Sequence, residues 1–560
     1  MKSRVPVLCA LLSAAATAHA QGPAVTKPAV SIELDRWSKP ITWRTPTGDY
    51  ATSIHATLLP DGRVLHTGYW RESAEPIDVE DYGPYTFLAA PDPLGAPLPD
   101  EVVVAGEPVP VDFDNDLAFP LVIGDDIFCA GHTLTSDGTF FSAGGTRTTL
   151  NTVTAEYNQY GLPYAVLFDG TSWTRPSEDM KVAGVLGGAA RWYPTCTRLA
   201  DGRILVTAGF DEVWPTPSAN LSAEVFDPAT ETWEVVSDFG ATPAEIENPD
   251  YPHVFLLPEP VEGYELLMFG DDGVPVLFEP GGATPWAVRP EARPGTPPFV
   301  QPNVGASSTL LPFRVADGEW GYRNGSVLMA GGDHGSQAQH SADVYDPVVG
   351  AWLPTVDLQI RRHHPSTVLL PDGRVLLLSG HDESTGDPGV TRAQYVDPRA
   401  GFAVSWGRAR ETVIRGYHSV ALLLPDGRVL VGGGRDQVTG ESLEKVTFRY
   451  YSPPYMAAER PSLDAAPAGV GYGTPFDVTT SGAAPAEACL LALGSMTHSV
   501  DMNQRYVQLE LASVSGPLAG SYTASLVGPA GPSVAPPGHY LLFVLDGERI
   551  PSEARVVLVQ

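Results

Sequence analysis

Four short segments of the sequence carry side chains that bind metals or take part in redox chemistry. They are Phe128-Cys129-Ala130-Gly131, Arg191-Trp192-Tyr193-Pro194, Arg415-Gly416-Tyr417-His418 and Met496-Thr497-His498-Ser499. Phenolate oxygen and imidazole nitrogen suit a cupric ion in a tetragonal site. The two tyrosines of these segments would supply two oxygens, and the two histidines would supply two nitrogens. The sequence therefore predicts a mononuclear copper site with the ligands Tyr193, Tyr417, His418 and His498.

An odd number of cysteines also indicates chemistry beyond disulfide bonds. The four cysteines are Cys9, Cys129, Cys196 and Cys489, and Cys9 lies in an N-terminal segment that is expected to be removed. At least one of the remaining three cannot form an intramolecular disulfide. In an oxidising compartment such a thiol pairs between molecules, reacts or is buried. Cys196 and Cys489 can pair only if the fold brings them together.

The elements that must position these side chains form a repeat that recurs seven times. Each copy has an apolar run, a tight turn that ends in glycine and a second apolar run, as in HATLLPDGRVLHTGYW from His55. The turn glycines are Gly62, Gly138, Gly202, Gly263, Gly325, Gly373 and Gly427. Asp-Gly or Asn-Gly between two such runs predicts a β-hairpin with a two-residue type I′ turn.

The spacing of the repeat predicts an all-β fold, a seven-bladed kelch-type β-propeller. The turn glycines lie 48 to 76 residues apart, which leaves room for two more strands in each unit, and four-stranded units of about 50 residues are typical of kelch blades. A β-sandwich with incidental hairpins is the alternative. After Ser452 the pattern changes to alternating strands, in a segment of the size of an immunoglobulin-like sandwich. The predicted domains are a propeller over 47–452 and a C-terminal immunoglobulin-like domain over 453–560.

The N-terminus has the layout of a secretory signal peptide. Lys2 and Arg4 precede an apolar run that ends at the small-residue site Ala18-His19-Ala20. We therefore predict a signal peptide over 1–20, an N-terminal arm over 21–46 and an exported protein, secreted or periplasmic. No other stretch approaches the roughly 18 apolar residues of a membrane helix. The net charge of −32 disfavours nucleic acid as a partner, because phosphate binding requires a basic surface.

Four motifs resemble the segments of one enzyme family, in that family's order. They are FCAGHTLTSDGTFFSAGG, RWYPTCTRLADGRILVTAGF, GYHSVALLLPDGRVLVGGG and THSVDMNQR. The arrangement is similar to that of galactose oxidase and, more closely, of glyoxal oxidase, which are copper radical oxidases. The resemblance covers nearly all of the chain after the predicted signal peptide.

This resemblance implies a role for each of five residues. Cys129 would be joined through its sulfur to the ring of Tyr193, giving a thioether-substituted phenol that holds a radical and binds copper. Tyr417 would be the axial ligand and the base that takes the substrate hydroxyl proton, and His418 and His498 would be the imidazole ligands. The cupric ion and the radical would each accept one electron from the substrate, and dioxygen would then reoxidise the site and yield hydrogen peroxide.

Two departures from galactose oxidase leave the substrate open. The chain reaches the first hairpin within roughly 35 residues of the predicted cleavage site, so the N-terminal carbohydrate-binding domain of galactose oxidase has no counterpart. The stretch Ala208-Gly209-Phe210-Asp211 lacks the tryptophan that stacks on the thioether in that enzyme, and Phe210 is the candidate for this role. Galactose is therefore not supported. The expected substrates are small aldehydes or primary alcohols with dioxygen, and the expected state is a monomer.

Other readings of the sequence have less support. A non-catalytic kelch-propeller protein that binds extracellular glycans is the second hypothesis, but a binder has no need of all five site residues. A hydrolase lacks the Gly-x-Ser-x-Gly elbow. The segment 112–116 resembles the start of a calcium loop without its glycine and distal glutamate, and the glycines at 184, 187 and 188 lack a βαβ context. Surface or loop-supporting roles, rather than a second metal site, are expected for His132, His334, His363, His364 and His381.

Overall fold

The computed structural model describes the chain from residue 31 to its C-terminus with several gaps. The described ranges are 31–44, 50–71, 82–91, 103–105, 107–108, 122–151, 156–181, 190–214, 218–220, 222–238, 250–270, 274–289, 291, 293–294, 305–332, 339–354, 356–382, 390–435 and 445–560. The predicted signal peptide, the segment 112–116, Gly184, Gly187, Gly188 and His334 lie outside these ranges. Within them, no helix has the length and apolar character needed to cross a membrane.

Each of the seven predicted hairpins is present and forms the two inner strands of one propeller blade. The seven pairs are β5 (His55–Leu58) with β6 (Val64–Arg71), β11 (Gly131–Leu134) with β12 (Phe140–Ala143), β17 (Thr195–Arg198) with β18 (Ile204–Thr207), β23 (His253–Val261) with β24 (Tyr264–Phe269), β27 (Ala306–Leu310) with β28 (Val327–Gly331), β32 (Ser366–Leu369) with β33 (Val375–Leu378), and β36 (Ser419–Leu423) with β37 (Val429–Gly433). The first strands follow one another around a ring, since β17 lies beside β11 and β23, and β36 lies beside β32 and β5. The predicted seven-bladed propeller is confirmed.

The outer strands complete the blades. They are β7 (Tyr82–Ala89), β15 (Ala165–Phe168), β16 (Trp173–Thr174), β21 (Ser222–Asp227), β22 (Thr232–Asp238), β25 (Pro275–Phe278), β26 (Trp286–Val288), β29 (Gln339–Asp346), β30 (Ala351–Trp352), β34 (Arg392–Asp397), β35 (Ala403–Arg410) and β38 (Thr447–Ser452). The N-terminal strands β2 (Arg36–Trp37) and β3 (Ile41–Arg44) pair with β38, so the two ends of the propeller sequence meet in the last blade. This pairing closes the ring.

All but one of the seven hairpin turns differ from the predicted type. The exception is the fourth, where Glu262 and Gly263 have φ of 55° and 94° between the paired residues Val261 and Tyr264, which is a type I′ turn as predicted. In the first turn Gly62 has a φ of 87° while Asp61 is absent from the residues with positive φ, so the turn is a type I turn followed by a left-handed glycine, not a type I′ turn. The Asp61 carboxylate accepts the backbone N–H of Arg63 at 2.9 Å, a bond that favours this geometry. The same bond recurs in other copies of the turn, for example from Arg428 N–H to Asp426 at 2.9 Å.

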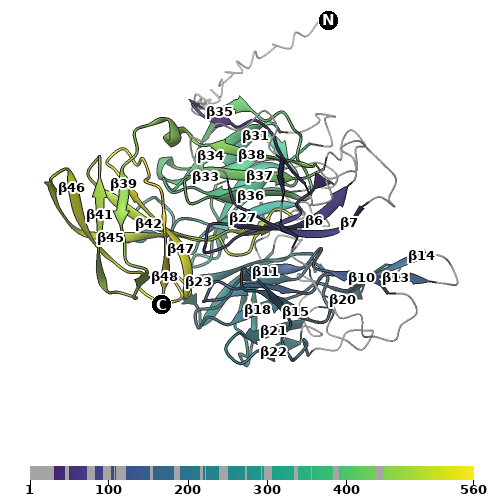
Figure 1. The fold of residues 1–560 in the computed structure, drawn as a ribbon. Helices are drawn as coiled ribbons and strands as arrows, with labels where there is room; N and C mark the ends of the chain where they lie inside the picture. Colours follow the sequence, from purple (N-terminus) through teal and green to yellow (C-terminus); the bar gives the residue numbers. More distant parts are fainter. Residues whose placement is uncertain are drawn as a thin grey trace, which may run out of the picture.

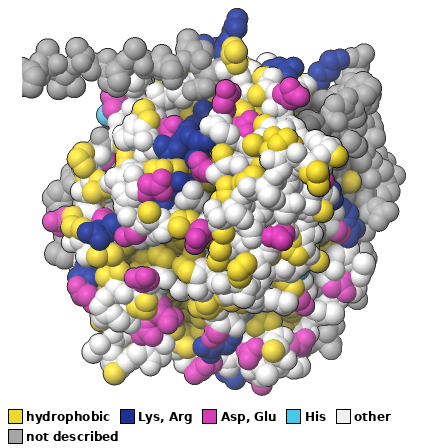
Figure 2. Space-filling model, turned by 90° about the vertical axis from the view of Figure 1, so that its left-hand side faces the viewer, with side chains coloured by type: hydrophobic (Ala, Val, Ile, Leu, Met, Phe, Trp, Pro, Cys, Tyr) yellow, Lys and Arg dark blue, Asp and Glu magenta, His cyan; other side chains and the backbone are white. Residues whose placement is uncertain are grey.

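The C-terminal domain has eight β-strands, and the predicted immunoglobulin-like β-domain is confirmed. Its strands are β39 (Ser462–Ala465), β40 (Gly469–Val470), β41 (Pro475–Ser481), β42 (Glu487–Ala492), β45 (Tyr506–Leu518), β46 (Ser521–Val527), β47 (Gly538–Leu545) and β48 (Arg555–Val559). It lies at one side of the propeller (Figure 1). On the face of the molecule that carries it, acidic and basic side chains are intermixed (Figure 2).

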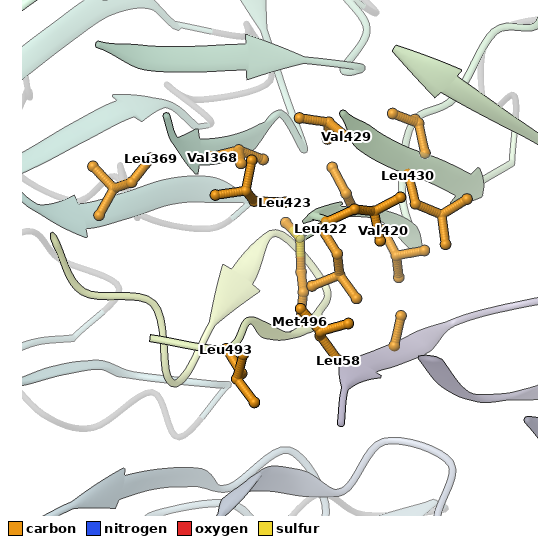
Figure 3. Packing of buried hydrophobic residues seen from close by; sticks show 14 of the residues in the cluster. Leu58, Val368, Leu369, Val420, Leu422, Leu423, Val429, Leu430, Leu493 and Met496 are labelled. Atoms are coloured by element: carbon orange, nitrogen blue, oxygen red, sulfur yellow. Dashed lines mark hydrogen bonds between the residues drawn. The ribbon is translucent and has the colours of Figure 1, made fainter. Parts of the chain in front are cut away.

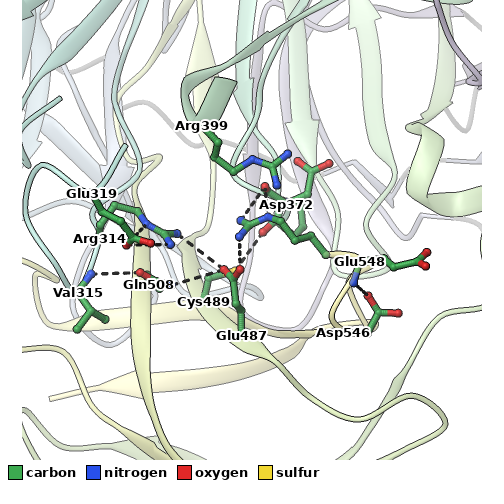
Figure 4. Close-up of polar contacts among 12 residues, drawn as sticks. Arg314, Val315, Glu319, Asp372, Arg399, Glu487, Cys489, Gln508, Asp546 and Glu548 are labelled. Atoms are coloured by element: carbon green, nitrogen blue, oxygen red, sulfur yellow. Dashed lines mark hydrogen bonds and ion pairs between the residues drawn. The ribbon is translucent and has the colours of Figure 1, made fainter. Parts of the chain in front are cut away.

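Polar contacts fix this domain against the propeller (Figure 4). Arg549 donates to the carbonyl oxygen of Asp372 in the propeller, and Glu487 of the C-terminal domain pairs with Arg314 of the propeller at 3.8 Å. Cys489 is buried at the interface, where its thiol donates to the carbonyl oxygen of Pro371 at 3.5 Å. Cys129, Cys196 and Cys489 are all buried and free, so the two domains do not bring a disulfide pair together.

A short hairpin of the C-terminal domain enters the centre of the propeller. Its strands are β43 (Ser495–Thr497) and β44 (Val500–Asp501), and β43 pairs with β5, the innermost strand of the first blade. Met496 is fully buried on this hairpin and lies among Leu58, Leu422 and Leu493 (Figure 3). Apolar burial therefore holds the hairpin in place, and its turn carries His498.

Candidate metal centre

A residue one or two positions before the first strand of a blade has a left-handed backbone in six of the seven blades. These residues are Cys129, Tyr193, Tyr251, Gly305, His364 and His418, with φ between 43° and 70°. Such a conformation costs a non-glycine residue about 1 kcal/mol or more. Five of the six keep a thiol, phenol or imidazole side chain despite this cost, which marks the centre of the ring as a functional site.

Buried arginines hold three of these strained residues. Arg191, Arg362 and Arg415 precede Tyr193, His364 and His418 by two or three positions, and each is at most 2% exposed. Their guanidinium groups donate to the carbonyl oxygens of Ala208 at 2.7 Å, Ser379 at 2.5 Å and Gly433 at 2.7 Å, where the second strand of each blade ends. The arginine thus ties the two ends of a hairpin together and fixes the backbone that presents the site residue.

His498 is positioned by a tight turn and not by a buried arginine. His498 and Ser499 have φ of 48° and 71° between the paired residues Thr497 and Val500, which is a two-residue type I′ turn. The Thr497 hydroxyl donates to the carbonyl oxygen of Ile54 at 3.0 Å and lies 2.6 Å from Nδ1 of His498. Because that hydroxyl has already given its hydrogen, Nδ1 donates to it, and Nε2 of His498 keeps its lone pair for a metal.

The five residues predicted from the sequence come together around this imidazole. The hydroxyls of Tyr193 and Tyr417 are hydrogen-bonded to each other. The ring of His498 lies 4.7 Å from that of Tyr193, 5.1 Å from that of Tyr417 and 4.4 Å from that of His418. Nε2 of His498 is 3.9 Å from Sγ of Cys129, and Cys129 packs against Tyr193 in a small buried cluster. Two phenols and two imidazoles therefore surround one point beside the thiol.

The electrostatics of this pocket disfavour ions in the absence of a cation. Burial raises the pKa of Tyr193 and of Tyr417 above the usual range of a phenol. Burial lowers the pKa of His418 and of His498 well below the usual range of an imidazole. The histidines are therefore neutral, which is the form that binds metal. A bound divalent cation would reverse the effect on the phenols, since its charge favours phenolate, and this donor set fits a cupric ion.

Two aromatic rings stack on Tyr193, and neither is the predicted one. The Trp192 ring lies 3.6 Å from the Tyr193 ring at an interplanar angle of 18°, and the Tyr251 ring lies at 4.5 Å and 29°. The prediction that Phe210 stacks on this tyrosine is wrong, because Phe210 contacts Trp192 at 6.0 Å instead. The indole N–H of Trp192 donates to the Thr146 hydroxyl at 3.0 Å, so its orientation is fixed.

The histidines expected at the surface are mostly buried. His132, His364 and His381 are 1%, 8% and 1% exposed, so only the loop-supporting half of that prediction fits them. His364 lies edge-on to Tyr417 at 4.9 Å and stacks on His363 at 4.0 Å. Among the described residues, no group of three or more His, Cys, Asp or Glu side chains is arranged to hold a metal ion. His364 therefore lies at the edge of the pocket formed by the paired tyrosines.

Asp250 lies beside Tyr251 and provides a test of the buried electrostatics. Its Oδ1 is buried and has no hydrogen-bond partner among the residues that the structure describes, and burial raises its pKa from 3.8 to about 6. The folded chain therefore holds this proton more tightly than the unfolded chain. The stability of the folded state is unaffected below about pH 4, falls as the pH rises towards 6 and stays lower above it.

We expect Asp250→Asn to stabilise the copper-free protein at neutral pH. The gain in the free energy of unfolding should reach at most about 3 kcal/mol above pH 6 and vanish near pH 4. Denaturant unfolding of both proteins across this pH range measures the difference. A gain that is equal at pH 4 and pH 8 would contradict the assignment of the raised pKa to Asp250.

Comparisons with known proteins agree with the fold. Residues 104–455 match the family model described as glyoxal oxidase N-terminus, and residues 460–559 match the galactose oxidase-like early set domain. An aldehyde oxidase of Arabidopsis thaliana is 26% identical over 475 residues, which are 78% of this chain and 72% of that protein. Galactose oxidase of Gibberella zeae is 24% identical over 465 residues, 78% of this chain and 61% of that protein. A fungal alcohol oxidase of the AA5 family, solved in complex with copper, shares the fold with a TM-score of 0.67 and 19% identity, over 94% of this chain and 100% of that chain.

Proposed function

The chain belongs to the glyoxal oxidase family of copper radical oxidases, and on this premise we propose that it oxidises small aldehydes or primary alcohols with dioxygen and releases hydrogen peroxide. The observation that carries the proposal is the pairing of the Tyr193 and Tyr417 hydroxyls beside Cys129 and His498. A binding protein has no use for two buried phenols in contact with two neutral imidazoles and a thiol.

The copper ion would be held by Tyr193, Tyr417, His418 and His498, and it would supply a one-electron acceptor and a positive charge that favours phenolate. Tyr417 accepts the hydroxyl proton of the substrate at its Oη. Tyr193 receives the hydrogen from the adjacent substrate carbon at its own Oη. Because the two hydroxyl groups touch, one CH–OH unit reaches both. The sum is RCH2OH + O2 → RCHO + H2O2, and a hydrated aldehyde gives the carboxylic acid in the same way.

The proposed cofactor includes a covalent bond between Cys129 and Tyr193. Its formation removes one hydrogen from the thiol and one from the ring, makes the sulfur–carbon bond and reduces one dioxygen to hydrogen peroxide. Cys129 is fully buried in a cluster with Tyr193, which supports attack on the ring. Export through the N-terminal segment 1–20 is part of the same proposal, since an extracellular oxidase meets both dioxygen and small substrates.

The experiment that tests this function is a peptide map of the copper-loaded protein. We expect a loss of two hydrogens that links the Cys129 and Tyr193 peptides and resists thiol reductants, followed by peroxide release with glyoxal-type aldehydes. Cys129→Ser should lose the link, and Cys196→Ser, a change at a second buried cysteine, should keep it. Separate peptides together with weak copper binding would favour the glycan-binding alternative.

Trp192 should stabilise the radical that Tyr193 is proposed to hold. An offset-stacked aromatic pair contributes about 0.5–1.5 kcal/mol, so Trp192→Leu should shorten the lifetime of the oxidised, substrate-free enzyme by about 2- to 10-fold. The decay of the radical absorption measures this lifetime. The matched control is Trp173→Leu, which removes an indole that packs on Phe168 at 4.9 Å, outside the site. Equal decay in both variants would show that Trp192 has no such role.

A further inference from the structure

A continuous chain of buried hydrogen bonds leads from Cys129 to the C-terminal domain. The backbone N–H of Cys129 donates to Nε2 of His55 at 3.0 Å. Nδ1 of His55 lies 3.1 Å from Nε2 of His132, and Nδ1 of His132 lies 2.6 Å from Oγ of Ser495. Oγ of Ser495 also lies 2.8 Å from Oγ1 of Thr57. The chain joins the first blade, the second blade and the strand β43.

The direction of each bond that involves an imidazole in this chain is fixed by its first donor. A backbone N–H can only donate, so Nε2 of His55 accepts, and a neutral imidazole then carries its hydrogen on Nδ1. Nδ1 of His55 therefore donates to Nε2 of His132, and the hydrogen of His132 lies on Nδ1, which donates to Ser495. The Ser495 hydroxyl is left to donate to Thr57 or to the carbonyl oxygen of His132 at 3.4 Å. The tautomers of both histidines are thus fixed, whichever acceptor the Ser495 hydroxyl takes.

The chain is closed to water. His55 and His132 are 3% and 1% exposed, and Thr57 and Ser495 are no more exposed than 1%. A buried polar group that loses its partner costs about 1–3 kcal/mol, so each member has a strong reason to keep its neighbour in place. A displacement of Ser495 would therefore strain the hydrogen bond to the Cys129 amide, and a displacement of Cys129 would strain the bond to Ser495.

Both ends of the chain lie next to residues of the proposed copper centre. At one end the acceptor His55 holds the amide of Cys129, whose backbone is in the strained left-handed region with φ of 63°. At the other end Ser495 lies three positions before His498 on the hairpin that enters the propeller. The ring of His55 also lies 5.8 Å from that of His498. The same four side chains therefore contact the segments that present a crosslinking residue and a metal ligand.

We propose that His55 and His132 are positioning residues that couple Cys129 to the docked hairpin of the C-terminal domain, so that the thiol is aligned with Tyr193 only when His498 is in place. This inference rests on the proposed function for the crosslink, but the alignment itself exists in the copper-free protein. It assigns to two buried histidines a task in cofactor formation, and it makes Ser495 the point at which the second domain acts on the first.

The experiment compares His55→Leu, which removes the acceptor, with His55→Gln, which restores an acceptor at the position of Nε2. Ser495→Ala cuts the far end of the chain. The matched control is His66→Leu, because His66 is a fully buried histidine of the same hairpin whose Nδ1 lies 2.9 Å from the Ser53 hydroxyl and not in this chain. Thermal unfolding of every variant shows which are folded.

Two readouts are taken from each folded variant. The first is the rate of the two-hydrogen mass loss after copper is added in air. Removal of a supporting partner around a metal site typically costs 10- to 100-fold, so His55→Leu should slow crosslinking by about 10-fold or more. His55→Gln should recover most of the rate, Ser495→Ala should slow it by a smaller factor, and His66→Leu should not change it. The second readout is amide hydrogen exchange of the Cys129 peptide in the copper-free protein. Exchange should be fastest in His55→Leu, less fast in Ser495→Ala, and close to the wild-type rate in His55→Gln and His66→Leu.

The two readouts separate the failure of this inference from the failure of the proposed function. Wild-type protein that never forms the crosslink would refute the proposed function, while the exchange data would still decide whether the chain positions Cys129. Unchanged exchange in both His55→Leu and Ser495→Ala would overturn the inference, as would a crosslinking rate in those variants equal to that of His66→Leu. If His55→Leu does not fold, Ser495→Ala alone decides the matter.

Discussion

Tyr193→Phe is expected to reduce oxidase turnover by about 1,000-fold or more, which corresponds to about 4 kcal/mol of lost transition-state stabilisation. The substitution removes the oxygen that is proposed to receive hydrogen from the substrate, and it leaves the ring in place. The stacking of Trp192 at 3.6 Å and of Tyr251 at 4.5 Å depends on the ring alone, so the pocket keeps its shape. The free energy of unfolding should change by only about 1 kcal/mol, the contribution of the lost hydrogen bond to Tyr417.

The measurement combines peroxide release, copper content and thermal unfolding. Tyr251→Phe is the matched control, because it makes the same change on the ring that stacks on Tyr193. The Tyr251 hydroxyl donates to the carbonyl oxygen of Ala130 at 3.0 Å, away from the paired phenols, so turnover should stay within about tenfold of the wild type. A Tyr193→Phe protein that binds copper and retains more than a tenth of wild-type turnover would refute the assigned role.

The sequence predicted the propeller well because the decisive signal is local and recurs. Each copy of the turn ends in glycine and lies between two apolar runs. Seven such copies predict seven similar hairpins, which fit a ring of seven blades. The turn type was predicted wrongly for most of the hairpins because the dipeptide Asp-Gly does not determine whether the aspartate takes a positive φ as well as the glycine. In the first turn Gly62 does and Asp61 does not. That choice depends on the loop of three residues and on the carboxylate of Asp61, which binds the N–H of Arg63.

The residues of the proposed centre could be predicted because their types are unusual at equivalent positions of the repeat. Cys129, Tyr193 and His418 each stand just before an apolar strand where the backbone is left-handed, and no such position needs a reactive side chain for folding. His498 lies in a separate domain, and only the resemblance placed it. Its insertion beside β5 depends on the pairing of Thr497 with His55, which is contact between distant segments that periodicity does not encode.

The supporting residues were missed for a related reason. Trp192 directly precedes Tyr193, and an indole next to a phenol in sequence normally lies on the opposite side of a strand. Here the left-handed backbone at Tyr193 breaks that alternation and allows the two rings to stack. The contact between His55 and His132 joins neighbouring blades. His55 and His132 are polar residues at the start of inner strands that are otherwise apolar, and this position was the sequence signal for a supporting role.

His498→Ala should weaken copper binding by more than about 100-fold, since the loss of a ligand exceeds the 10- to 100-fold cost of losing a ligand's supporting partner. Thr497→Val provides the finer test. Valine keeps the shape of threonine but cannot accept the hydrogen of Nδ1 or donate to the carbonyl oxygen of Ile54. The imidazole then loses the bond that fixes its tautomer, and copper binding should weaken by about 10- to 100-fold. Competition with a chelator of known affinity measures both variants.

The control for these two variants is Thr480→Val, a change in strand β41 of the same domain. Thr480 is fully buried, and its hydroxyl makes no hydrogen bond among the residues that the structure describes. This variant loses a buried hydroxyl without touching the hairpin, so its copper affinity should equal that of the wild type. If Thr497→Val bound copper as tightly as Thr480→Val, the hydroxyl of Thr497 would not set the tautomer of His498. If His498→Ala also bound copper as tightly as Thr480→Val, the metal would have to lie elsewhere. The two paired phenols would then lose their proposed role as copper ligands.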